Sequence, residues 1–121
     1  MADAGRTAEE FFAAWTSGDF ERARGLLADD VTFEGPFDTF HDADAYLQAL
    51  RGLAGALTGT DVRRVFSDGD EACVLYELHT GPVPDAPVAE WYRVRDGRIT
   101  AIRAYFDARP FAPMFAGRGG A

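Results

Sequence analysis

The sequence predicts an α+β fold in which helices pack on one face of an antiparallel sheet. Residues 7–57 carry apolar side chains mostly at helical spacing, whereas residues 61–107 alternate between apolar and polar side chains. Residues 90–107 consist of two alternating segments joined by Arg95-Asp96-Gly97. An Asp-Gly pair between such runs is the strongest short-range signal for a hairpin. Helices followed by a meander of strands are typical of the α+β class.

The first helix is expected to begin at Thr7. Thr7 followed by Glu10 forms a capping box, and apolar residues then recur at helical spacing at Phe11, Ala14 and Trp15. Gly18 ends this helix, and Asp19 can cap a second one. The apolar side of the second helix comprises Phe20, Ala23, Leu26 and Leu27.

A short strand is predicted over residues 31–34, and Gly35-Pro36 ends it. Asp42 or Asp44 can start a third helix, and Gly52 and Gly55 leave its end open. The apolar residues of the third helix are Tyr46, Leu50, Leu53 and Leu57.

The second half is predicted to form strands over residues 61–66 and 71–80, separated by a turn at residues 67–70. A loop with three prolines, residues 81–87, precedes the hairpin. The chain is expected to be a single domain over residues 1–121, with a core from about residue 7 to 110 and a C-terminal tail over 111–121. Three apolar residues of the tail can dock on an apolar surface: Phe111, Met114 and Phe115.

The alternation in the hairpin sorts its side chains onto two faces. The face that must reach water or a partner carries Trp91, Arg93, Arg95, Arg103 and Tyr105. The opposite face, predicted to be buried, carries Val88, Glu90, Tyr92, Val94, Thr100, Ile102, Ala104 and Phe106. Glu90 is the only charge on the buried face, so the search for function begins there.

Composition excludes several classes of protein and site. The chain has 121 residues, is 47% hydrophobic and carries a net charge of −8, which argues against nucleic acid or an anionic membrane as a partner. The single cysteine, Cys73, excludes an internal disulfide and a cysteine-built metal site, and we expect it to be a small buried apolar residue. No signal peptide or membrane-spanning run is present in this sequence, so we expect a cytoplasmic protein.

The order of these elements resembles the SnoaL-like branch of the nuclear transport factor 2-like superfamily, from about Thr7 to Pro110. The matching segments are Gly18-Asp19-Phe20, residues 27–33, Asp96-Gly97-Arg98-Ile99 and Tyr105-Phe106-Asp107. The resemblance implies a cone-shaped, curved sheet with about three N-terminal helices on its concave face and a small-molecule pocket inside. Members include ketosteroid isomerases, polyketide cyclases, limonene epoxide hydrolase, dehydratases and non-catalytic proteins, so the fold alone does not determine the function.

The catalytic groups of these relatives are only partly present. At the three positions that ketosteroid isomerases use, the resemblance places Phe11 for the tyrosine, Gly35 for the base and Glu90 for the acid. At the positions of the epoxide hydrolases it places Ala104 for the aspartate and Glu77-Leu78-His79 for the Arg-x-Asp motif. Neither mechanism is therefore expected to transfer whole.

Glu90 is the first candidate catalytic residue. A carboxyl group that faces an apolar interior resists ionisation, which raises its pKa towards values suited to acid–base catalysis. The alternative is a structural acid that is hydrogen-bonded to Tyr92, Tyr46 or a backbone group.

Glu77 and His79 are the other two candidates, because they share one face of their strand. The resemblance turns that face inward, where the two would join Glu90 in a cluster, and we follow it. Periodicity alone favours burying the opposite face, which comprises Ala72, Val74, Tyr76 and Leu78.

No metal site is expected. His41 lies near several aspartates, but a loop and a helix cap explain Asp38, Asp42 and Asp44 more simply.

An apolar pocket wall is expected to bind a small hydrophobic molecule. Its predicted members are Phe11, Trp15, Phe33, Phe37, Tyr46, Leu75, Tyr92, Ile102, Ala104 and Phe106. We expect a cofactor-independent acid–base enzyme that catalyses an isomerisation, cyclisation or hydration/dehydration. The alternatives are a non-catalytic ligand-binding or accessory protein and a dimeric module whose cone is filled. A homodimer is expected to form through the outer face of the sheet.

Overall fold

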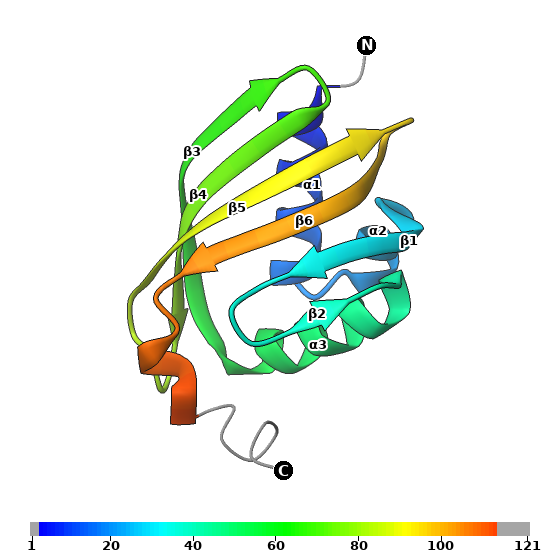
Figure 1. Cartoon of the computed structure of the whole chain (residues 1–121). Coiled ribbons are helices and arrows are strands. Elements are labelled where there is room, and N and C mark those ends of the chain that lie inside the picture. The colour runs from blue at the N-terminus through cyan, green and yellow to red at the C-terminus, as the bar shows by residue number, and fades with distance from the viewer. Residues whose placement is uncertain (1–2, 114–121) are drawn as a thin grey trace.

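Three helices lie on one side of a curved sheet, which confirms the predicted α+β class. The computed structural model describes residues 3–113, and Figure 1 shows the helices behind and beside the sheet. They are α1 (Ala4–Thr16), α2 (Phe20–Gly25) and α3 (Ala43–Ala56), and a short 3-10 helix, η1 (Arg109–Phe111), follows the last strand. Helix α1 packs across β3, β4 and β5, whereas α3 packs against β1. None of the described helices is long and apolar enough to cross a membrane.

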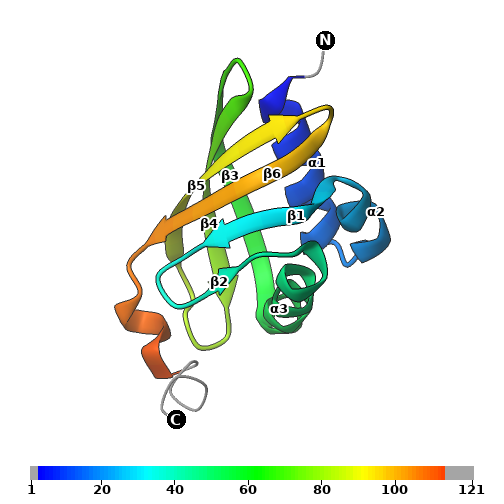
Figure 2. The same cartoon turned by 45° about the vertical axis from the view of Figure 1, so that its right-hand side comes forward.

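The sheet has six strands in the order β2-β1-β6-β5-β4-β3, and it is open rather than closed into a barrel (Figure 2). Its strands are β1 (Leu27–Glu34), β2 (Thr39–Phe40), β3 (Leu57–Asp68), β4 (Glu71–Thr80), β5 (Ala86–Arg95) and β6 (Arg98–Phe106). The prediction of a purely antiparallel sheet is wrong at one pair, because β1 runs parallel to β6. These two strands are distant in the chain, so no hairpin turn dictates their relative direction.

Two of the three predicted helix starts are confirmed. The Asp19 side chain accepts a hydrogen bond from the backbone N–H of Arg22 at 3.2 Å, and Asp42 accepts one from Ala45 at 2.8 Å. Helix α1, however, begins before Thr7, because Asp3 caps it by accepting from Gly5 N–H at 3.0 Å. The first N–H groups of a helix have no partner within the helix, and the Asp3 carboxylate accepts from one of them, that of Gly5.

The cap of α3 provides a stability prediction. Replacing Asp42 by alanine is expected to lower the free energy of unfolding by about 1 kcal/mol, because the first turn of α3 loses the acceptor of a backbone N–H. Urea unfolding followed by circular dichroism measures this loss. Asp30→Ala, an exposed change on β1, is the control and should change the free energy by less than about 0.5 kcal/mol. Equal losses in the two variants would contradict the capping role.

The β5–β6 hairpin turns where the sequence predicts. Asp96 and Gly97 have φ angles of 51° and 76°, as the two central residues of a type I′ turn require. A register shift follows, since Arg93 pairs with Ala101 and Val94 pairs with Ile99. Thr100 is therefore the extra residue of a β-bulge, and Ile99 takes the buried place predicted for Thr100.

Strand β4 alternates strictly between buried and half-exposed residues. Its buried face includes Tyr76, whose ring lies 4.5 Å from that of Phe12 on α1. Glu77 and His79 lie on the opposite, outer face, so the inward placement taken from the family resemblance is wrong. Periodicity identified the face correctly, because burying Glu77 and His79 would expose Tyr76 and leave charges without water.

The outer face of the sheet also exposes large apolar side chains. Phe66 and Tyr105 are 57% and 55% exposed. Cys73, predicted to be buried, is half-buried on this face because it shares the outward phase of β4. The predicted homodimer through this surface stays a prediction.

Candidate functional site

A cavity of about 410 Å³ lies between the helices and the inner face of the sheet. Helix α3 forms one wall, strands β4, β5 and β6 form another, and the loop between β1 and β2 contributes to the lining. Six residues predicted to bind ligand line it: Trp15, Phe33, Phe37, Tyr46, Ala104 and Phe106. Among the described lining residues, Glu90 and Asp38 carry charge, so the wall is otherwise apolar or uncharged.

Four predicted ligand-binding residues are not part of the lining. Phe11, Tyr92 and Ile102 are buried in the core behind it, where helix α1 packs on the sheet. Leu75 is wrong for a different reason, because it shares the outward phase of Glu77 and His79.

Sequence reasoning missed several residues of the cavity wall. Tyr76 and Leu78 line it because β4 turns its more apolar face inward. The alternation of apolar and polar residues along β4 could have predicted this. Phe111, on η1, lines it as well and packs edge-on against Phe106, with ring centroids 5.2 Å apart. The prediction that Phe111 docks on an apolar surface is thus confirmed, whereas Met114 and Phe115 lie outside the described residues.

Glu90 faces the cavity from the middle of β5, as predicted. Its neighbours on the adjacent strands are Val74 on β4 and Ala104 on β6. Only 5% of Glu90 is exposed, and it is the one charged residue that is buried within residues 3–113. The hydroxyl of Tyr92 donates to Oε1 of Glu90, and the hydroxyl of Tyr76 donates to Oε2 at 3.3 Å.

Burial raises the pKa of Glu90 from 4.5 to about 7, although the hydrogen bonds from Tyr92 and Tyr76 partly oppose that shift. The cause is desolvation, which penalises the ionised form of an acid. Both protonation states of this carboxyl group are therefore accessible near neutral pH. Its ionised form accepts from two hydroxyl groups, and its neutral form gains one O–H to donate.

Two residues of the cavity wall carry further groups that can donate hydrogen bonds. The Trp15 Nε1–H group is buried and has no hydrogen-bond partner within residues 3–113. Tyr46 also lines the cavity and stacks on Phe33 at 4.7 Å between ring centroids. Burial and the charge of Glu90 raise the pKa of Tyr46 well above 10, so this hydroxyl stays protonated and can donate. A buried donor without a partner is costly, and a ligand acceptor can relieve that cost.

Glu77 and His79 do not join Glu90. Glu77 accepts from Arg63 on β3, and the two ring nitrogens of His79 contact Asp61 and Pro84 on the outer side of the sheet. The predicted three-residue cluster is therefore wrong, and the groups that do meet Glu90 are two tyrosines.

The cap interpretation of the acidic residues near His41 is confirmed for Asp42, which caps α3. Asp44 lies inside the first turn of α3 and accepts from Arg24 at 3.0 Å.

Comparisons with known proteins identify the family. The chain is 34% identical to a protein from Kribbella flavida DSM 17836, with 96% of each chain covered and a TM-score of 0.85. It is 26% identical to an LEH-like epoxide hydrolase from M. tuberculosis, covering 98% of this chain and 96% of that one, with a TM-score of 0.74. A nuclear transport factor 2-like protein from Cytophaga hutchinsonii shares the fold at 22% identity, with 92% and 96% covered and a TM-score of 0.81.

Residues 8–102 match the model of the SnoaL-like domain. This match agrees with the three helices, the curved open sheet and the cavity between them. The chain belongs to the SnoaL-like domain family.

Proposed function

We propose that this chain binds a small hydrophobic molecule carrying a carbonyl or hydroxyl oxygen, and that Glu90 exchanges a proton with it. The reaction would be an isomerisation, a cyclisation or a hydration/dehydration, each of which needs proton transfer at a positioned group. The single observation that carries this proposal is the Glu90 carboxyl, which is buried at an apolar cavity with a pKa raised to about 7. An acid–base catalyst works best when its pKa lies near the working pH.

The cavity supports the proposed class of ligand. Its volume of about 410 Å³ falls within the range of about 300–1,000 Å³ that is typical of small-molecule pockets. Aromatic and aliphatic side chains form most of the wall, which favours a flat apolar molecule. The Tyr46 hydroxyl and the unpartnered Trp15 N–H are donors on residues of the cavity wall, so an oxygen acceptor on the ligand would pair with one or both of them.

The hydrogen bonds of Glu90 support a proton-transfer role in both directions. Neutral Glu90 can give its proton to a ligand atom, and the carboxylate that results accepts from Tyr76 and Tyr92. In the reverse direction that carboxylate takes a proton from the ligand. The two tyrosines thus hold the carboxyl group in place, and they take the supporting role that the family resemblance implied for Glu77 and His79.

A non-catalytic ligand-binding protein is the second candidate. One observation favours it: both carboxylate oxygens of Glu90 already have a tyrosine donor, as in a structural acid. In this candidate function the ligand still binds in the cavity, but Glu90 transfers no proton to or from it.

A screen for both binding and turnover tests the proposal. Apolar ketones and alcohols of increasing size are added to the protein, binding is measured by thermal shift, and products by mass spectrometry. Ala104→Phe places a ring in the cavity beside Glu90 and is expected to weaken binding at least tenfold, because the ring fills space that the ligand would occupy. Ala101→Phe is the matched control, since Ala101 lies on the same strand and pairs with outward-facing Arg93.

Binding that survives in Ala104→Phe would place the ligand outside the cavity and contradict both candidates. Binding to the wild-type chain without turnover of any ligand would favour the non-catalytic candidate.

A further inference from the structure

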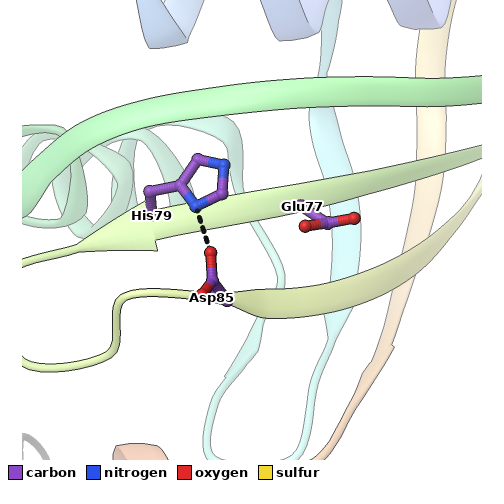
Figure 3. A group of neighbouring side chains, drawn as sticks. All are labelled: Glu77, His79 and Asp85. Atoms are coloured by element: carbon purple, nitrogen blue, oxygen red, sulfur yellow. Dashed lines mark ion pairs between the residues drawn. The ribbon is translucent and has the colours of Figure 1, made fainter.

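A second group of polar side chains lies on the outer face of the sheet, around His79 on β4. The ring nitrogen Nε2 of His79 lies 2.8 Å from Oδ2 of Asp61 on β3. The other nitrogen, Nδ1, lies 2.7 Å from the carbonyl oxygen of Pro84 and 3.1 Å from Oδ1 of Asp85. Figure 3 shows Asp85, from the segment that precedes β5, directed at the imidazole ring.

The partners of His79 are all oxygen atoms without a hydrogen to donate. A neutral imidazole has one N–H donor and one acceptor nitrogen, so it can satisfy oxygens on only one side of the ring. With Nε2–H donating to Asp61, the lone pair of Nδ1 faces two further oxygen atoms. That arrangement is favourable only when a cation lies at Nδ1, either a proton or a metal ion.

Glu77 supplies a third side chain to this group. It lies two residues before His79 on β4 and therefore on the same face. Arg63 contacts only Oε2 of Glu77, with Nη2 at 2.7 Å and Nε at 2.9 Å. One ligand atom from each of Glu77, His79 and Asp85 can be chosen so that all three lie within 4.8 Å of one another.

We propose that Glu77, His79 and Asp85 form a binding site for one divalent transition metal ion, for which Zn²⁺ is the probe. One imidazole nitrogen with carboxylate oxygens is a donor set that zinc accepts, with bonds of about 2.0–2.2 Å. Two ligands of one ion then lie about 3–4 Å apart, so small side-chain rotations bring these atoms into place. The Pro84 carbonyl is a further oxygen at the same nitrogen.

The neighbours of the site suit a cation. When Nδ1 of His79 binds the metal, Nε2 carries the hydrogen and donates it to Asp61, 2.8 Å away. A metal-bound histidine almost always donates its other N–H to such a carboxylate or carbonyl oxygen. Within residues 3–113 the carboxylates of Asp61, Glu77 and Asp85 outnumber the guanidinium groups that form ion pairs with them, since Arg63 alone does so. A bound ion would join the segment between β4 and β5 to strand β4, on the side of the sheet away from Glu90. The site is independent of the proposed function.

Calorimetric titration of the metal-free chain with ZnCl₂ tests the site. The wild-type chain is expected to bind one Zn²⁺ per molecule and to prefer it to Mg²⁺, which favours oxygen ligands. His79→Ala is expected to weaken the affinity at least tenfold. His41→Ala is the matched control, because His41 is the only other histidine of the chain and lies on the loop between β2 and α3.

Asp85→Asn is a second variant that should fold like the wild type, because the side chain of Asp85 is 75% exposed. It is expected to weaken Zn²⁺ binding without changing the circular dichroism spectrum. On the wild-type chain, nitrogen NMR should show a Zn²⁺-dependent shift of His79 Nδ1.

Three results would overturn the proposal. They are a dissociation constant weaker than about 1 mM, an affinity that is unchanged in His79→Ala, and a loss of binding in His41→Ala.

Discussion

Replacing Glu90 by glutamine is expected to lower kcat by about 10²–10⁴-fold for any ligand that the chain turns over, the range that general acid–base catalysis contributes. Glutamine keeps the size of the side chain and an oxygen that accepts from Tyr92 or Tyr76, but it neither gives nor takes a proton. KM is expected to change little, because the cavity wall is unaltered. For the wild-type chain, kcat/KM should change with pH around a midpoint of about 7, the pKa of Glu90.

Glu71→Gln is the control for this experiment. Glu71 lies on β4 and accepts from Trp91 Nε1 at 2.8 Å on the outer side of the sheet, away from the cavity. The same chemical change at Glu71 should leave kcat and the pH profile as they are. A Glu90→Gln chain with the wild-type kcat would assign the carboxyl group to a structural role and leave the ligand-binding candidate standing.

The second large effect concerns stability. The free energy of unfolding of the wild-type chain is expected to fall by about 3 kcal/mol between pH 4.5 and pH 8 through Glu90 alone. In the unfolded chain Glu90 ionises near its ordinary pKa of 4.5, whereas in the folded chain it stays protonated up to about 7. A pKa difference of about 2.5 at about 1.4 kcal/mol per pKa unit gives about 3.5 kcal/mol in all, and about 0.4 kcal/mol of it is already lost at pH 4.5, where the unfolded chain is half ionised.

The sign follows from proton binding. Between pH 4.5 and 7 the folded chain holds a proton on Glu90 that the unfolded chain has released, so raising the pH favours unfolding. Well below pH 4.5 Glu90 is protonated in both states and does not change the free energy of unfolding. Above pH 7 Glu90 is ionised in both states, so the free energy of unfolding stays lowered by the cost of burying its carboxylate.

Urea unfolding of wild type and Glu90→Gln at several pH values isolates this contribution. The free energy of unfolding of Glu90→Gln minus that of the wild type should increase as the pH rises from 4.5. Other groups titrate too: the hydrogen bond to Asp61 raises the pKa of His79, and its contribution is also lost as the pH rises. His79 is present in both proteins, so its effect cancels in the difference. A difference that does not vary with pH would show that Glu90 has an ordinary pKa.

The parts of the fold that follow from local backbone preference were predictable from the sequence. The type I′ turn at Asp96-Gly97 and the caps at Asp19 and Asp42 depend on a few adjacent residues, and the structure has them in place. The inward direction of Glu90 follows from strand alternation in the same way. Thr100 departs from the pattern because a bulge adds one residue to β6, and an added residue inverts the alternation beyond it.

Strand β4 illustrates how a family resemblance and a physical pattern can conflict. Alternation placed Tyr76 inside and His79 outside, and the packing of Tyr76 on Phe12 agrees with it. The alternation gave the right answer because the apolar residues of this chain decide which face of β4 is buried. The positions at which relatives carry catalytic residues do not decide it. Alternation also places Tyr76 and Tyr92 on the inner face of the sheet, although it does not bring their hydroxyl groups to Glu90.

The sequence by itself determined the class of fold, the hairpin and the one buried acid, because each depends on residues that are close in the chain. Only the tertiary structure decided that β1 runs parallel to β6, that a cavity remains between α3 and the sheet, and that two tyrosines meet at Glu90. It also brought Asp61 and Asp85 to the two sides of His79. These features depend on contacts between distant segments, whose geometry is set when the helices and strands pack together.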